Sequence, residues 1–80
     1  MDPPKINYIS NNSLMVVNKQ GLMRQLFVPF HVQVLQDTEY FKEKSWVVVE
    51  EVKPHPQFIL LYRVINNWWP YFIFRLDVRF

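Results

Sequence analysis

The stretch FILLYRVINNWWPYFIFRLDVRF, residues 58–80, decides the fold of this chain. Two runs rich in aromatic and branched residues flank a short break of Asn and Pro, which is the pattern of a β-hairpin. The second run alternates, and its apolar side holds Phe72, Phe74, Leu76, Val78 and Phe80. Its polar side holds Arg75, Asp77 and Arg79. Because side chains alternate across a strand, this run predicts a strand with one buried face, but it names no chemistry.

The length of the hairpin loop determines which side chains share a face. A turn of Asn66 and Asn67 alone would place Arg63 opposite Pro70. A five-residue loop over residues 66–70 gathers the apolar side chains on one face, and a shift of one residue would exchange the faces. Its cross-strand pairs are Val64 with Phe72, Tyr62 with Phe74 and Leu60 with Leu76. We therefore predict the longer loop, with both tryptophans at the tip and a half-apolar second face that a closed barrel or a partner would cover.

Upstream of the hairpin, apolar runs and prolines predict further strands. Residues 1–12 are expected to form a tail with at most one short edge strand, and residues 13–80 a single β domain. Residues 13–17 and 46–52 are predicted strands because they are rich in branched and apolar residues. Residues 22–36 form one long strand or two short ones, and the interruption at Pro29 suits a bend between two sheets.

The segment after Pro29 alternates regularly, with Phe30, Val32 and Val34 predicted to be buried and His31 exposed. The polar residues 37–45 are predicted to form a loop or one helical turn, capped by Asp37 or Thr38. The predicted fold class is therefore all-β. We expect a small five-stranded antiparallel roll or barrel, SH3-like or OB-like, with at most one short helical turn.

Composition excludes several classes of protein. The 80 residues suffice for one domain, and the absence of cysteine excludes disulfides and thiolate metal sites. A net charge of +2 is far from the dense basic stripe of a dedicated nucleic-acid binder. The first ten residues lack the basic and apolar regions of a signal peptide, and charged residues interrupt the longest apolar region. We therefore expect a cytoplasmic protein without a membrane span.

Catalytic and metal-binding patterns are also missing from the sequence. His31 and His55 have no neighbouring ligands at metal spacing. Glu50 and Glu51 are adjacent in a predicted strand, so they point to opposite faces and cannot act together on one substrate. The single glycine excludes a phosphate-binding glycine-rich loop. We therefore expect a protein that is not an enzyme, with no catalytic residues, no metal and no small-molecule cofactor.

Binding is better supported than catalysis. The predicted partner-binding residues are Trp68, Trp69, Tyr71, Arg63, Arg75 and Arg79. Adjacent tryptophans in an extended chain cannot both point inward, and an exposed indole is a typical interface anchor. The first hypothesis is a protein-interaction module or accessory subunit that binds another protein or itself. The alternative is a single-stranded nucleic-acid-binding domain, in which the arginines contact phosphates and the rings stack on bases.

The tryptophan pair followed by Pro70 resembles the SH3 family, whose ligand groove uses a tryptophan to dock proline-rich peptides. The resemblance covers three residues. The family's acidic RT loop and early tyrosine-rich motif are absent, and the pair lies too close to the C-terminus for the strands that should follow. We assign no family and transfer no function from this resemblance.

Overall fold

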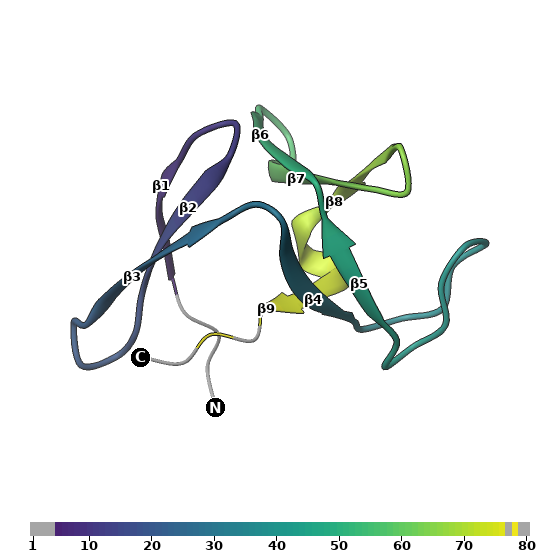
Figure 1. Cartoon of the computed structure of the whole chain (residues 1–80), viewed down its shortest axis with the longest axis horizontal. Coiled ribbons are helices and arrows are strands. Elements are labelled where there is room, and N and C mark those ends of the chain that lie inside the picture. The colour runs from purple at the N-terminus through teal and green to yellow at the C-terminus, as the bar shows by residue number, and fades with distance from the viewer. Residues whose placement is uncertain (1–4, 77, 79–80) are drawn as a thin grey trace.

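The computed structural model describes residues 5–76 and 78 and is nearly all-β, as predicted (Figure 1). Nine short strands form three separate antiparallel sheets, and one 3₁₀ turn is present in this part of the chain. The expected five-stranded barrel is not observed, because the sheets do not close into a barrel. The structure has nine strands instead of the predicted five because several predicted strands are each divided into shorter ones. None of the described segments is a helix with the length and hydrophobicity needed to cross a bilayer.

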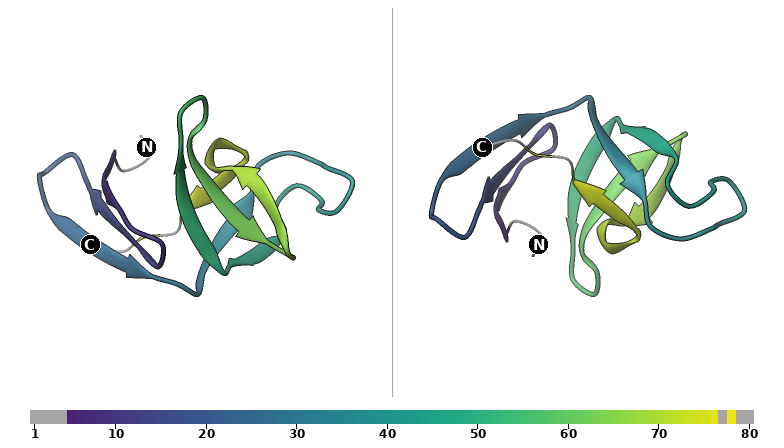
Figure 2. Two further views of the ribbon diagram at one scale, coloured as in Figure 1. Left: turned by 90° about the horizontal axis from the view of Figure 1, so that it is seen from above. Right: turned by 90° about the horizontal axis from the view of Figure 1, so that it is seen from below.

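The first sheet is a meander of β1 (Lys5–Ile9), β2 (Ser13–Val17) and β3 (Met23–Phe27). It lies beside the other two sheets in both views of Figure 2. Leu14 and Val16 of the central strand β2 are completely buried and belong to the common core. The first sheet therefore covers one side of the core, and the inward-facing side chains of β2 make the contact.

The chain enters the second sheet at the predicted bend. β3 ends before Pro29, and β4 (Phe30–Val34) begins directly after it in a different sheet. The alternation of β4 is confirmed, since Phe30, Val32 and Val34 are buried while His31 is exposed. β4 is the central strand of this sheet, between β5 (Trp46–Val49) and β9 (Phe74–Leu76).

The third sheet consists of β6 (Glu51–His55), β7 (Ile59–Val64) and β8 (Asn67–Pro70). β5 and β6 follow each other with only Glu50 between them, and the backbone N–H of Glu50 donates to the carbonyl of Arg63 at 2.9 Å. The predicted strand over residues 46–52 is therefore a bent one. Its first half pairs with β4 and its second half with β7, so it connects the second and third sheets.

The predicted register of the last hairpin is wrong. The turn consists of Ile65 and Asn66, so Val64 pairs with Asn67 and Tyr62 pairs with Trp69. Both tryptophans therefore lie in β8 rather than at the tip. A 3₁₀ turn, η1 (Tyr71–Ile73), follows, and β9 then pairs with β4 instead of β7.

The 3₁₀ turn also interrupts the alternation of buried and exposed residues that the sequence predicts over residues 72–80. Phe72 is exposed, whereas its neighbours Ile73 and Phe74 are both buried. The two residues can be buried together because one lies in the turn and the other in a strand. Phe80 and the polar residues Asp77 and Arg79 lie outside the described residues.

The loop predicted over residues 37–45 is present without the alternative helical turn, and it begins two residues earlier, so that it spans residues 35–45 between β4 and β5. Thr38 organises it, because its Oγ1 accepts the backbone N–H groups of Tyr40 and Phe41 at 3.1 and 3.0 Å. Asp37 Oδ1 accepts the N–H of Glu43 at 2.8 Å. Phe41 is buried in the core, so the loop is anchored by an apolar side chain within a polar sequence.

The turn between β7 and β8 carries strain that a substitution can relieve. Ile65 and Asn66 have φ angles of 50° and 59°, and a branched side chain is unfavourable in this region. Ile65 is also exposed, so its side chain contributes little burial. We expect Ile65→Asn to raise the free energy of unfolding by about 1 kcal/mol in urea titrations. Ile65→Val, which keeps the branch, should give no such gain, and an Ile65→Asn variant less stable than the parent would contradict this account.

Candidate interaction surface

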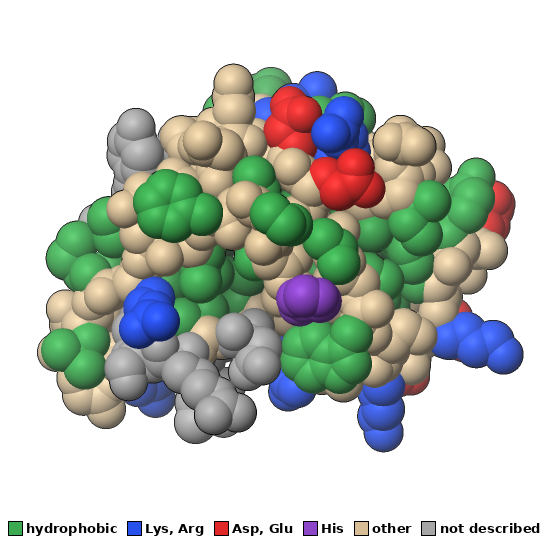
Figure 3. Space-filling model, in the orientation of Figure 1, with side chains coloured by type: hydrophobic (Ala, Val, Ile, Leu, Met, Phe, Trp, Pro, Cys, Tyr) green, Lys and Arg blue, Asp and Glu red, His purple; other side chains and the backbone are tan. Residues whose placement is uncertain are grey.

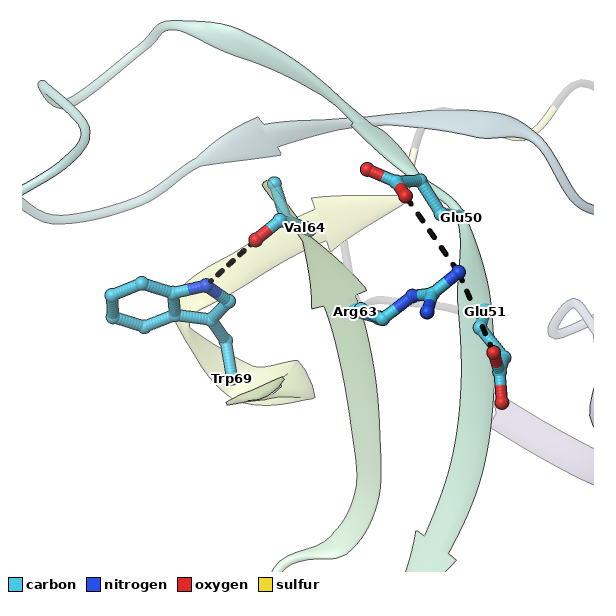
Figure 4. A network of polar contacts seen from close by, with 5 residues as sticks. All are labelled: Glu50, Glu51, Arg63, Val64 and Trp69. Atoms are coloured by element: carbon cyan, nitrogen blue, oxygen red, sulfur yellow. Dashed lines mark hydrogen bonds and ion pairs between the residues drawn. The ribbon is translucent and has the colours of Figure 1, made fainter. Parts of the chain in front are cut away.

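Trp69 belongs to the wall of the core rather than to a free surface. Its indole Nε1 donates to the carbonyl of Val64 at 3.2 Å (Figure 4). The ring centroid lies 5.1 Å from that of Phe41 and 5.6 Å from that of Tyr40, both in edge-on arrangements. Trp69 therefore ties the 35–45 loop to the third sheet.

Trp68 lies on the opposite face of β8 and is half-buried. It pairs with Arg63 of β7, and the Nζ of Lys53 lies 4.4 Å from its ring centroid. A cation over an indole face is a favourable contact, worth about 0.5–1 kcal/mol at exposed sites. Part of the indole face is therefore already occupied by a residue of the same chain.

The two predicted basic residues that the structure describes, Arg63 and Arg75, do not gather into one site. Arg63 lies between two carboxylates, with its Nη2 3.7 Å from Glu50 and 3.6 Å from Glu51 (Figure 4). The prediction that Glu50 and Glu51 cannot act together on one group is therefore wrong, because Glu50 lies at the bend between β5 and β6 and not within a regular strand. The Nε of Arg63 is buried and has no hydrogen-bond partner among residues 5–76 and 78. Arg75 is on β9 of the second sheet, where its Nη2 donates to Oε1 of Gln33 at 2.6 Å. Arg79 lies outside the described residues.

Tyr71 is the predicted residue that leads to a connected group of exposed rings. It is half-buried in η1, and its ring centroid is 5.9 Å from that of Phe72. Phe72 is 6.2 Å from Phe58, which is 5.0 Å from His55. We call this group of four rings, His55, Phe58, Tyr71 and Phe72, the aromatic surface. Phe72 is 54% exposed and Phe58 38% exposed, so the rings contact one another while facing solvent.

The turn between β6 and β7 is built so that Phe58 is held in place. His55 Nδ1 accepts the backbone N–H groups of Gln57 and Phe58 at 3.1 and 3.2 Å. The next residue, Ile59, has a φ of 69°, in the left-handed region that a branched residue seldom adopts. Such strain persists only where the surroundings hold it, and it is often found at binding sites.

The sequence did not reveal the aromatic surface. The alternation predicts Phe72 on the buried side of a strand and Phe58 at the start of one, whereas Phe72 is exposed and Phe58 lies in a turn. The sequence signal for the β6–β7 turn is the pair Pro54 and Pro56, which restricts the backbone conformation at the end of β6. No sequence pattern links that turn to residues 71–72, because their proximity depends on the short β7–β8 turn.

Comparison of the chain with protein-family models, with curated proteins and with solved structures gives no match.

Proposed function

We propose that this protein is a non-catalytic protein-interaction module that binds apolar side chains of another protein through the aromatic surface. The observation that carries the proposal is the contact of four rings across β6, the following turn and η1, with Phe72 more than half exposed. Contiguous exposed apolar groups of this kind usually mark an interface, and large rings provide most of the binding energy at such sites.

The arrangement of residues 30–76 supports an SH3-like roll as the architecture of this module. Taken as one bent strand, β5 and β6 give the order β4, β5–β6, β7, β8 and β9, with η1 before the last strand. β9 returns to pair with β4, and the bent strand serves two sheets. This likeness concerns the fold, and the function is argued from the exposed rings.

The nucleic-acid alternative receives less support from the described side chains. Arg63 is paired with two carboxylates, Arg75 is bonded to Gln33, and the two arginines belong to different sheets. A single-strand site requires a continuous basic track along which stacking rings are placed. Retention on single-stranded DNA at low salt that falls steeply as salt is added would favour this alternative over ours.

The proposal is tested with a random peptide library displayed on phage and selected against the whole chain. Peptides that bind should be enriched in apolar residues. Phe58→Ser and Phe72→Ser should each weaken binding at least about fivefold, because a buried aromatic anchor contributes more than about 1 kcal/mol.

Trp46→Ser is the matched control, because Trp46 is also an exposed aromatic but lies on β5 of the second sheet. It should bind the selected peptides as the parent chain does. A library that yields no binder, or peptides that bind Phe58→Ser and Phe72→Ser unchanged, would refute the proposal. Urea titrations of each variant establish that the fold is retained.

A further inference from the structure

β3 is an edge strand without the usual protection. It pairs with β2 on one side only, and no described backbone group is hydrogen-bonded to its other side. Met23 is 58% exposed and Phe27 61% exposed, and hydrophobic side chains gather over the first sheet in Figure 3. Proteins normally protect such edges with charges, prolines or bulges. β3 contains one charge, Arg24, and its pairing with β2 is regular.

The hydrogen bonds at both ends of the β2–β3 ladder show which backbone groups face the open edge. The N–H of Val28 donates to the carbonyl of Asn12 at 2.8 Å, and that of Asn18 donates to Leu22 at 3.0 Å. In an antiparallel pair these bonded positions recur every second residue. The even-numbered residues of β3 therefore bond β2. Met23, Gln25 and Phe27 direct their N–H and C=O groups outward.

We propose that β3 pairs antiparallel with β3 of a second copy of this chain, about a two-fold axis that passes by Gln25. In this register Met23 of one copy faces Phe27 of the other, and the two Gln25 residues face each other. All outward N–H groups of both strands then find carbonyl partners. The pairing also covers exposed Met and Phe side chains, which form a favourable sulfur–aromatic contact.

Neighbouring registers are less favourable for reasons visible in the sequence. An axis at Arg24 would set Arg24 of one copy opposite Arg24 of the other, and like charges directly opposite are destabilising. An axis at Leu26 would set Met23 opposite Pro29, which has no N–H to donate. Only the axis at Gln25 uses the whole of β3 without either penalty. The self-complementary strand therefore favours a second copy over an unrelated partner.

This inference goes beyond the proposed function and is independent of it. β3 belongs to the first sheet, whereas the aromatic surface belongs to the third sheet and η1. Loss of dimerisation and loss of peptide binding can therefore be measured separately.

The first test measures molar mass by analytical ultracentrifugation over a range of concentrations up to about 1 mM, where even weak dimers are populated. The parent chain should move from 9.8 kDa towards twice that mass. Gln25→Pro should stay monomeric, because proline has no N–H to donate across the proposed interface. The N–H that is lost faces outward, so the substitution removes no hydrogen bond between β2 and β3. Gln25→Thr is the control and should still dimerise. Both variants lose the same 3.3 Å bond from Gln25 Nε2 to Ser13 Oγ.

The second test uses charge and cross-linking at the proposed axis. Gln25→Lys and Gln25→Glu should each be monomeric alone and form a mixed dimer when combined. The chain has no cysteine, and facing hydrogen-bonded residues have Cα atoms about 5.5 Å apart, within disulfide range. Oxidised Gln25→Cys should therefore form a covalent dimer, whereas Gln20→Cys in the β2–β3 turn should not. A parent chain that stays monomeric, or a dimer unaffected by Gln25→Pro and Gln25→Lys, would overturn the proposal.

Discussion

Trp69→Ala is expected to lower the free energy of unfolding by about 3 kcal/mol, whereas Trp68→Ala should lower it by less than about 1 kcal/mol. Trp69 loses its bond to the Val64 carbonyl and its contacts with Phe41 and Tyr40. Trp68 loses one cation–π contact with Lys53. Adjacent tryptophans that look equivalent in the sequence should therefore differ strongly in their effect on stability.

Urea denaturation followed by far-UV circular dichroism measures both effects. Trp69→Phe is the matched variant. It retains a ring beside Phe41 but removes the indole N–H that donates to the carbonyl of Val64. It should fall between the parent and Trp69→Ala. Equal losses for Trp68→Ala and Trp69→Ala would show that the two indoles contribute alike and would contradict the asymmetry described here.

Tyr62 should make the fold sensitive to alkaline pH. Burial, with a smaller contribution from the nearby Tyr71, raises the pKa of the Tyr62 phenol well above its ordinary value of 10.0. The folded chain then keeps a proton that the unfolded chain has released. The contribution of Tyr62 to stability is fully present below about pH 10, and it declines by about 1.4 kcal/mol per pH unit above that value.

This pH dependence is measured by comparing urea titrations at about pH 8 and about pH 11.5. The parent should lose about 2 kcal/mol more than Tyr62→Phe, which has no proton to release. Tyr40→Phe is the control, because it also removes one phenol hydroxyl but at an exposed position. An alkaline loss that is the same in Tyr62→Phe and the parent would show that other groups control it.

The parts of the fold that the sequence predicts are those governed by simple periodicity. β4 alternates without interruption, so its buried face could be read from Phe30, Val32 and Val34. Pro29 cannot donate a ladder bond and therefore identified the bend between two sheets. The break of the strand at Glu50 was missed, because neither glycine nor proline accompanies it.

The last hairpin was mispredicted because two local features override the pattern. The β7–β8 turn places Ile65 at a positive φ, where Asn or Gly would be expected, so the turn was displaced in the prediction. The 3₁₀ turn η1 then shifts the periodicity, and Phe72 and Phe74 no longer share a face. Neither feature follows from a run of alternating residues.

Of the predicted partner-binding residues, Tyr71 is the one whose ring belongs to the aromatic surface. Phe58, Phe72 and His55 complete that surface and were not among the predicted residues. Exposure of the two phenylalanines depends on the placement of η1 beside the β6–β7 turn, which requires the three-dimensional arrangement. Phe41 was missed for the converse reason, since it is a core residue within a polar segment.

The pairing of β9 with β4 imposes an order on the folding of this chain. Every other strand pair in the described sheets joins consecutive strands, so each can form as a local hairpin. Gln33 and Arg75, which pair across β4 and β9, are 42 residues apart in the sequence. Closing so long a segment costs chain entropy, and β9 has only three residues with which to offset it. The hairpins should therefore assemble first and β9 should dock last, which makes the C-terminal strand the first to open and exchange its amide protons.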